Sequence, residues 1–354
     1  MNMDENLLER VEIKGSTEVP EVELVSFFKK MFPDRYELLS EHWRWLYRID
    51  QFKSIQPPLV ALLDDKVIGH VAQIPVVIKK GDQEKLGAWG VDGGVLPPYR
   101  KYGLGSQLME IWIKQFPISL GFCTEALFRI LLKQGWAPRR TTYALQLPFR
   151  PDRHPKHRNG FRSAPLRLAG PGWNLLAHLI TRARTIGMKK VREVPLSSAR
   201  LQNWSLLHHP EEFKEPFHIA RTPEFLTWRL LDSPFRDQYR ILESEDADVA
   251  AVVRLFQGGG LRRAQIVSLS GNVEDARTLH RFLGGFLLWA IDHHLDLIKM
   301  VSGDPFVVRL AHRWFPIKSA LRFVSFCHQA EDREMMAQTD HLWELIDYDL
   351  DFLN

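Results

Sequence analysis

The two halves of this chain contain the same order of expected helices and strands, and this repetition restricts the fold more than any other feature. Apolar periodicity and turn residues in the first half predict helices within 20–50, strands at 58–63, 67–78 and 86–96, a helix at 103–116, a strand at 118–123, a helix at 125–134 and a strand at 140–147. The second half predicts a helical segment at Phe225–Leu230, strands at 239–243, 247–256 and 263–269, a helix at 275–294, a strand at 297–301, a helix at 305–314 and a strand at 321–327. This order indicates an α/β (mixed α+β) class, with two tandem domains that each form a mixed, mostly antiparallel sheet flanked by helices.

We expect an N-terminal domain at 1–148, a basic linker with an amphipathic helix at 149–200, and a C-terminal domain at 201–354. The segment from Arg139 to Arg192 contains 13 Lys and Arg residues and one acid, Asp152. It contributes +12 to a chain whose net charge is +4, so the remainder of the chain carries −8. Such a segment either attracts an anionic partner or is a solvated connector.

Residues 148–172 are rich in Pro, Gly, Arg and His and are expected to be a connector. Trp173–Lys190 follows as a basic amphipathic helix with Leu175, Leu176, Leu179, Ile180 and Ala183 on one side. This helix raises the prospect of weak contact with a membrane surface through residues 173–192. Nucleic-acid binding is not expected, because the basic stretch lacks interleaved aromatic residues.

The composition is that of an ordinary globular protein, with 45% apolar and 25% charged residues. No stretch of about 18 apolar residues occurs, so we expect no membrane-spanning helix. The N-terminus is acidic and lacks the apolar region of a secretory signal, which makes a cytoplasmic location the default expectation. Two cysteines, Cys123 and Cys327, exclude a disulfide scaffold and suit a reducing compartment.

The run Gly93-Gly94-Val95-Leu96-Pro97-Pro98-Tyr99-Arg100-Lys101-Tyr102-Gly103-Leu104-Gly105 carries the most chemical information. A strand ends in a glycine-containing turn that opens a helix. Glycines let backbone N–H groups approach a phosphate, the helix N-terminus adds unpaired donors, and Arg100 and Lys101 add positive charge. The turn therefore predicts a site for an anion such as a pyrophosphate. It is neither a Walker A loop nor a dinucleotide fingerprint, because the lysine and third glycine that these require are missing.

At these residues the sequence resembles the GNAT superfamily of acyl-CoA-dependent N-acyltransferases. The resemblance covers roughly residues 20–148 and includes Lys133-Gln134-Gly135-Trp136, which looks like the family's Lys-x-Gly-Phe ending. It implies an acyl-CoA co-substrate, most simply acetyl-CoA, and no metal. The resemblance further implies that the pyrophosphate and pantetheine of the acyl-CoA are held by Val95, Leu96, Pro97, Arg100, Lys101, Tyr102, Gly103, Leu104, Gly105 and Ser106. The thioester carbonyl would be polarised by a backbone N–H near Leu96, in a V-shaped gap between the strand 86–96 and the strand Ile118–Cys123.

The resemblance also implies direct attack by an acceptor amine, which needs a base for the ammonium proton and an acid for the leaving thiolate. Asp92 is the first candidate base, with hydrogen bonding inside a turn as its structural alternative. Further candidates are Glu125, His42 and His70, of which His70 also fits a buried sheet histidine. The tyrosine that often serves the family as acid is replaced by Leu131. Three nearby tyrosines, Tyr99, Tyr102 and Tyr143, could replace it as the acid that protonates the thiolate. If none of them does, water could supply the proton.

An acceptor pocket would be lined by His42, Trp45 and Trp89, with Trp43 as a further aromatic candidate, although aromatic residues at such spacing are also typical of a core. The second half has no counterpart of the anion turn, because Ser270-Gly271-Asn272-Val273-Glu274-Asp275 places two acids where the first half has Arg100 and Lys101. We interpret it as a degenerate copy. The histidine pairs 208–209 and 293–294 lack the spacing of a metal site, so no metal is expected.

Two functions remain open at this stage. One is an N-acyltransferase that acts on a small amine, such as an amino sugar or amino acid, with anionic amines among the candidates. The other is a non-catalytic acyl-CoA-binding or scaffold protein. The sequence leaves the acceptor, the acyl chain length and the oligomeric state open.

Overall fold

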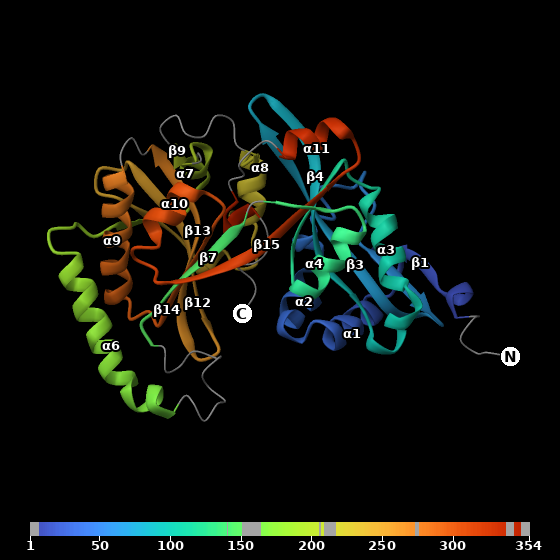
Figure 1. Ribbon diagram of the computed structural model, residues 1–354, viewed down its shortest axis with the longest axis horizontal. Coiled ribbons are helices and arrows are strands. Elements are labelled where there is room, and N and C mark those ends of the chain that lie inside the picture. Colours follow the sequence, from blue (N-terminus) through green and yellow to red (C-terminus); the bar gives the residue numbers. More distant parts are fainter. Residues whose placement is uncertain are drawn as a thin grey trace. The chain divides into compact units, whose positions relative to one another are not determined.

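The computed structural model of the protein describes residues 7–139, 141–150, 164–204, 207–208, 217–272, 276–337 and 343–347. The chain forms two compact units (Figure 1). The first contains residues 1–139 and 322–339, and the second contains residues 140–321 and 340–352. Each has a mixed, mostly antiparallel sheet flanked by helices, which confirms the predicted fold class.

In the first unit the strands are ordered β1-β2-β3-β4-β5-β15. They are β1 (Glu12–Gly15), β2 (Leu59–Leu63), β3 (Lys66–Lys80), β4 (Gln83–Val95), β5 (Ile118–Cys123) and the second part of β15 (Ile317–Cys327). Among these neighbours only β4 and β5 run parallel. Tight turns at 64–65 and 81–82 join β2 to β3 and β3 to β4, and positive φ angles at Asp64, Asp65 and Gly81 allow them.

Five helices of the first unit are α1 (Glu21–Met31), α2 (Tyr36–Leu46), α3 (Leu104–Ile113), α4 (Glu125–Lys133) and α11 (Ala330–Ala337). The helical region predicted within 20–50 is therefore two helices, separated by the short 3-10 turn Pro33–Arg35. α3 packs on β2, β3 and β4 through Leu104, Leu108 and Trp112, which belong to the unit's apolar core. This packing fixes the start of α3 against the end of β4.

In the second unit the strands are ordered β15-β7-β14-β13-β12-β11-β8. They are the first part of β15, β7 (Thr142–Pro148), β14 (Leu297–Ser302), β13 (Leu261–Asn272), β12 (Val249–Gly258), β11 (Tyr239–Glu243) and β8 (Arg192–Val194). The helices of this unit include α6 (Ala164–Arg184), α7 (Ser198–Gln202), α8 (Pro223–Leu226), α9 (Ala276–Asp292) and α10 (Pro305–Ala311).

The internal repeat is visible in the strand pairing. In the first unit an antiparallel β3–β4 pair is followed by α3 and by β5, which runs parallel to β4. In the second unit an antiparallel β12–β13 pair is followed by α9 and by β14, which runs parallel to β13. The same hairpin, helix and parallel strand therefore occur in both halves.

Two strands belong to the units differently from the sequence expectation. β7 lies in the second unit between β14 and β15, although the sequence grouped it with the first half. β15 is long, and its residues 317–321 pair with β7 while its residues 322–327 pair with β5 in the first unit. Each unit thus contains one strand from the other half of the sequence, β15 in the first unit and β7 in the second.

The amphipathic helix starts earlier than predicted. α6 runs over Ala164–Arg184, so residues 164–172 are helical rather than part of a connector, and the helix ends six residues before Lys190. Nothing in the structure explains how the helix continues through Gly170-Pro171-Gly172. In the described parts of the chain, no helix is both long enough and apolar enough to cross a membrane.

Candidate functional site

The parallel strands β4 and β5 separate before either of them ends. Their pairing covers only Gly87–Trp89 on β4 and Ile118–Leu120 on β5. β4 continues to Val95 and β5 to Cys123. A gap between the two strands therefore opens beyond Trp89 and Leu120, at the place where the resemblance required one.

A β-bulge lies on β4 just past this opening. The register of the β3–β4 pair shifts between His70 and Ala72, and Asp92 on β4 has a φ of 47°, which is unfavourable for a residue with a side chain. Bulges re-aim the backbone and are common beside active sites. This one lies three residues beyond the last β4–β5 pair.

The predicted anion turn follows β4 and leads into α3. A 3-10 helix spans Pro97–Tyr102, and Gly103 then adopts a φ of 76°, which favours glycine. No side chain caps α3, and the hydrogen bonds at its start run from Ser106 N and Gln107 N to Gly103 O. The amides of Leu104 and Gly105 precede these bonds, where a helix has donors without intrahelical acceptors.

The surface above this turn is open. A Cβ atom on Gly103 would meet no other atom within 4 Å, and one on Gly105 would meet only Val95 Cγ2, at 3.6 Å. Backbone donors, a helix N-terminus and unfilled space therefore coincide at Gly103–Gly105. These are the properties that a bound phosphate group requires.

The two cations of the turn have different roles. The exposed Arg100 donates from Nε to the carbonyl oxygen of Val95, at 2.9 Å, and so joins the turn to the end of β4. The Lys101 ammonium lies 4.8 Å from the centre of the Tyr102 ring. Both cations stay at the surface of the turn, where they add positive charge to the backbone donors.

Leu96 requires a correction to the expectation for the oxyanion donor. Its amide donates to the carbonyl oxygen of Ile68 on β3, at 2.9 Å. This N–H is engaged within the sheet and is therefore not the group that would polarise a thioester.

The carboxylate of Asp92 lies at the centre of a polar cluster. Tyr47 donates its hydroxyl to Asp92 Oδ2 at 2.9 Å, and Arg35 Nη2 approaches the same oxygen at 3.2 Å. The Asp92 side chain is 3% exposed and that of Arg35 is 10% exposed. Tyr47 follows the end of α2 and Arg35 lies in the turn before it, and no local sequence pattern connects either residue to β4.

His70 supports the same bulge from β3. Its Nδ1 donates to the carbonyl oxygen of Asp92 at 2.8 Å, because a carbonyl can only accept. The ring is buried among Phe27, Phe28 and Tyr47. Burial lowers the pKa of His70 to about 4, so the imidazole is neutral at pH 7 and acts as a structural support for the bulge.

The second carboxylate candidate, Glu125, begins α4 after the N-cap Thr124. Its oxygens pair with Arg129, at 3.3 Å, and with Arg322 on β15. Cys123, at the end of β5, is half-buried, and burial raises the pKa of its thiol to about 11. Leu131, at the position of the family's tyrosine, is buried in the apolar core, so that position supplies no acid.

The residues expected to line an acceptor pocket or to act as the acid differ in burial. Trp89 is 1% exposed and stacks on Phe122 at 5.4 Å, so it is a core residue of the sheet. His42 and Trp45 on α2 are half-buried, and Trp43 is buried. Tyr99 and Tyr102 are half-buried in the 3-10 helix, whereas Tyr143 lies on β7 of the second unit beneath Lys318.

Two stacked indoles fill the core beneath the opening. Gly90 is the first residue of β4 past the paired region, and a Cβ there would come within 2.7 Å of Trp112 Cη2. Trp112 stacks on Trp136, with ring centres 5.9 Å apart and planes 7° apart. The absence of a side chain at residue 90 thus lets a large ring close the core directly under the gap.

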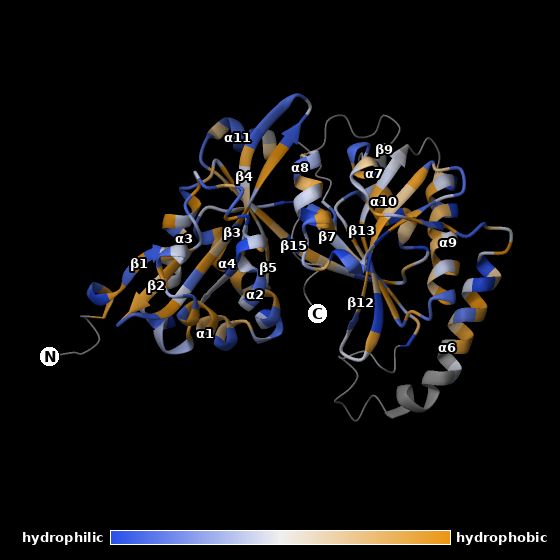
Figure 2. Cartoon of the chain, turned by 180° about the vertical axis from the view of Figure 1, so that it is seen from behind, coloured by the Kyte–Doolittle hydropathy of each residue, from blue (hydrophilic) through white to orange (hydrophobic). Residues whose placement is uncertain are grey.

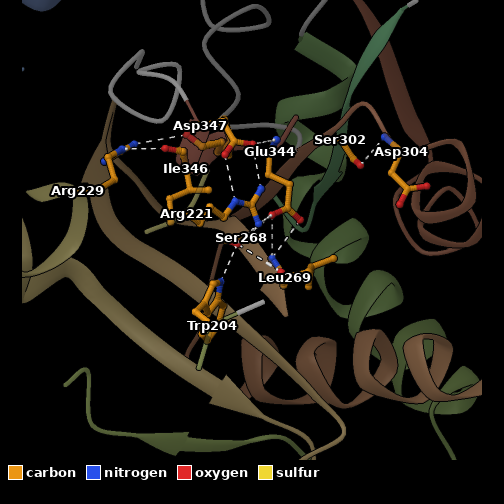
Figure 3. A network of polar contacts seen from close by, with 11 residues as sticks. Trp204, Arg221, Arg229, Ser268, Leu269, Ser302, Asp304, Glu344, Ile346 and Asp347 are labelled. Atoms are coloured by element: carbon orange, nitrogen blue, oxygen red, sulfur yellow. Dashed lines mark hydrogen bonds and ion pairs between the residues drawn. The ribbon is translucent and has the colours of Figure 1, made fainter. Parts of the chain in front are cut away.

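The corresponding gap in the second unit is occupied by the chain itself (Figure 3). Pairing of β13 with β14 ends at Ile266 and Met300. Past this point, Gly303 N donates to Trp343 O at 2.9 Å and Leu269 N donates to both oxygens of Glu344, at 3.1 and 3.2 Å. The segment Trp343–Asp347 therefore lies between the two strands.

A buried ionic cluster holds this segment in place. Arg221 pairs with Glu344 at 2.8 Å and with Asp347 at 2.9 Å, and Ser268 donates to Glu344 at 2.9 Å. Burial raises the pKa of Glu344 to about 6, although Arg221 opposes the shift. Burial alone would lower the pKa of Arg221, but the charges of Asp347 and Glu344 raise this pKa above its usual value. The cluster shows that the second gap is closed, as expected for a degenerate copy.

The described residues contain no group of three or more His, Cys, Asp or Glu side chains that could hold a metal ion.

The hairpin, helix and separated parallel strand define a fold class, the GNAT-type acyltransferase fold, present here in two copies. No family model and no curated protein matches the sequence. Among solved structures, the chain resembles Saccharomyces cerevisiae N-myristoyltransferase with bound myristoyl-CoA, at a TM-score of 0.57 and 12% identity over 92% of this chain and 84% of that one. It also resembles a Pyrococcus horikoshii protein assigned as an acetyltransferase, at a TM-score of 0.50 and 14% identity over 96% of both chains. At these identities the likeness shows the fold alone.

Proposed function

We propose that the protein is an acyl-CoA-dependent N-acyltransferase whose active site is the β4–β5 gap of the first unit. The observation that carries the proposal is the coincidence of two features on consecutive elements. The strands separate beyond Trp89, and the uncapped start of α3, with open space above Gly103, follows at the end of the same strand. A diphosphate on the turn would place its attached thioester arm along β4 toward the gap.

The closed gap of the second unit indicates which backbone N–H group would bind the thioester oxygen in the gap of the first unit. Leu269 lies three residues beyond the last β13–β14 pair, and its amide binds a carboxylate. Asp92 lies three residues beyond the last β4–β5 pair. We therefore assign the thioester oxygen to the amide at or beside Asp92, in place of Leu96. Such a donor stabilises the oxyanion that forms when an amine attacks.

The reaction needs few side chains. A C–N bond forms as the acceptor nitrogen attacks the thioester carbon, the C–S bond then breaks, and water carries the proton that the attacking nitrogen loses to the leaving thiolate. Holding the two reactants in contact can contribute about 7–11 kcal/mol. The ammonium proton of the acceptor passes to the Asp92 carboxylate, with the Tyr47 hydroxyl as its hydrogen-bonded neighbour.

The acyl group is expected to be short. Trp112 and Trp136 close the core beneath Gly90, where a long acyl chain would otherwise enter. We therefore propose acetyl-CoA as the co-substrate and a small amine, such as an amino sugar or amino acid, as the acceptor. The sequence expectations of a cytoplasmic location and of no metal are part of this proposal.

Binding and release of coenzyme A test the proposal. We expect acetyl-CoA to raise the melting temperature of the wild type and to lose this effect in Arg100→Glu. The matched control Lys66→Glu reverses an exposed charge at the β2–β3 turn of the same unit and should bind normally. Release of free CoA from acetyl-CoA across a panel of small amines would establish transfer. Failure of the wild type to bind acetyl-CoA would refute the proposal.

One observation favours a second function, an acyl-CoA-binding or scaffold protein. Leu131 replaces the family's tyrosine and is buried in the core, so it supplies no acid for the leaving thiolate. Saturable binding of acetyl-CoA without release of CoA to any amine of the panel would support this function.

A further inference from the structure

Helix α6 packs against the second unit through its small and hydroxyl-bearing side. It lies alongside α9 (Figure 1). Thr181 and Thr185 are buried there, and Ala177 packs on the apolar core that α9 helps to form. The Thr185 hydroxyl donates to the carbonyl oxygen of Thr181 at 2.8 Å, so this polar face is satisfied within the helix.

The opposite face of α6 presents large aliphatic side chains to solvent, and hydrophobic residues recur along the coloured part of the helix in Figure 2. The exposed fractions are 64% for Leu175, 48% for Leu176, 56% for Leu179, 49% for Ile180 and 82% for Ile186, just beyond the helix. With 3.6 residues per turn, Leu175, Leu176 and Leu179 fall with Ile180 and Ala183 within an arc of about 140°. The side that an ordinary surface helix buries is thus turned outward.

Positive charge borders this apolar face on both sides. Arg182 and Arg184 lie at its two edges by helical spacing, and both are exposed. Lys189, Lys190 and Arg192 follow the helix and are exposed as well.

The acidic residues near these cations do not neutralise the positive charge beside the apolar face of α6. Lys189 pairs with Glu245, and Asp292 lies against both Lys190 and Arg182. Glu243 pairs with Arg192. The cations of these pairs are more than half exposed, so water screens the pairs and leaves the cations able to meet another anion.

We propose that α6 docks the protein on an anionic lipid surface, with the face Leu175–Ile186 in the boundary between headgroups and acyl chains. A helix with an aliphatic face, basic borders and an adjoining basic segment has the two signals that reversible membrane binding requires. A second copy of the chain fits less well, because two such faces packed together would bring the borders of Arg182 and Arg184 against like charges. The inference does not depend on the proposed acyltransferase activity.

Co-sedimentation of the full chain with vesicles tests the proposal. The probes are vesicles of phosphatidylcholine alone and vesicles of phosphatidylcholine with phosphatidylglycerol. We expect binding to the anionic vesicles that weakens as salt is raised and is much weaker on phosphatidylcholine alone. The double variant Leu175→Gln/Leu179→Gln should reduce vesicle affinity at least about tenfold, since two exposed apolar groups are lost. Arg182→Gln/Lys189→Gln should reduce affinity and flatten its salt dependence.

The matched control is Val22→Gln, which removes an apolar side chain that is 69% exposed on α1 of the first unit. It should bind vesicles as the wild type does. Circular dichroism and thermal unfolding of the leucine variant should equal those of the wild type, because both leucines are exposed. The proposal would be overturned if the wild type did not bind anionic vesicles. It would also be overturned if the leucine variant bound them as tightly as the wild type. A concentration-dependent dimer that the leucine variant abolishes would also overturn it, because a second copy would then cover the face.

Discussion

The hydroxyl of Tyr47 donates to Oδ2 of Asp92, the residue at the β4 bulge, across 2.9 Å. Arg35 approaches the same oxygen, and His70 donates a hydrogen bond to the backbone carbonyl oxygen of Asp92. The left-handed backbone at Asp92 is therefore stabilised by three side chains from α2, the turn before it and β3. Such strain is retained where the surroundings hold it in place, and it is concentrated at functional sites.

The first prediction separates the catalytic role of Asp92 from its structural role. Asp92→Asn keeps an acceptor for Tyr47 but removes the charge opposite Arg35, and it should abolish amine-dependent CoA release while acetyl-CoA still binds. Tyr47→Phe should cost about 1 kcal/mol of unfolding free energy and retain part of the activity. Steady-state rates, coenzyme titrations and urea unfolding of both variants supply the comparison. Full activity in Asp92→Asn would remove the assignment of the base.

The second prediction concerns the anion turn. Gly103→Ala forces a φ of 76° on a residue with a side chain, which costs about 1–2 kcal/mol, and it should weaken acetyl-CoA binding. Gly135 has a φ of 87° and follows α4. Gly135→Ala is therefore a control with similar strain at another helix end, and its coenzyme affinity should equal that of the wild type. Equal affinities in both variants would mean that the turn does not hold the ligand.

The third prediction tests the limit on acyl length. Trp112→Leu should allow longer acyl-CoA substrates, raising the rate with hexanoyl-CoA relative to acetyl-CoA at least about tenfold, a change worth about 1.4 kcal/mol. Trp43→Leu removes another buried indole of the same unit and should leave the ratio unchanged. An unchanged ratio in Trp112→Leu would show that the acyl group does not approach this core.

The strand, turn and helix over 83–113 could be predicted because their information is local. Two-residue turns, an apolar run and glycines at Gly103 and Gly105 each determine backbone shape within a few residues. The apolar side of α6 was predicted for the same reason. Its start was missed because Gly170-Pro171-Gly172 normally ends a helix.

What the sequence could not supply is the pairing between distant segments. β7 joins β14 and β15, and β15 reaches both sheets, although no local residue pattern encodes either partner. The same holds for Arg221, which meets Glu344 and Asp347 across more than a hundred residues. Asp92 was identified from its glycine neighbours, whereas Tyr47 and Arg35 became visible only when the fold brought them to it.

The fourth prediction follows from the buried His70. Because its pKa in the folded protein is about 4 and that of an unfolded histidine is about 6.5, the unfolded chain binds more protons between these values. Folding stability should therefore fall as the pH is lowered through this window, by about 2 kcal/mol between pH 7 and pH 5. His70→Gln cannot titrate and should lose about that much less over the same interval. Urea unfolding of both proteins at the two pH values measures the difference, and equal slopes would contradict the assignment.

The fifth prediction concerns the closed gap of the second unit. Because Glu344 already occupies the Leu269 amide, one chain should bind one acetyl-CoA, as calorimetry or native mass spectrometry would count. Glu344→Ala leaves Arg221 with Asp347 alone and leaves the Leu269 amide without its acceptor, so it should cost about 2–3 kcal/mol of unfolding free energy. Acetyl-CoA affinity should stay unchanged, because the variant lies in the second unit and the turn at 100–105 in the first. Glu245→Ala, in the same unit but exposed, is the matched control and should change neither quantity. Two coenzymes per chain in the wild type would show that Glu344 does not close the second gap.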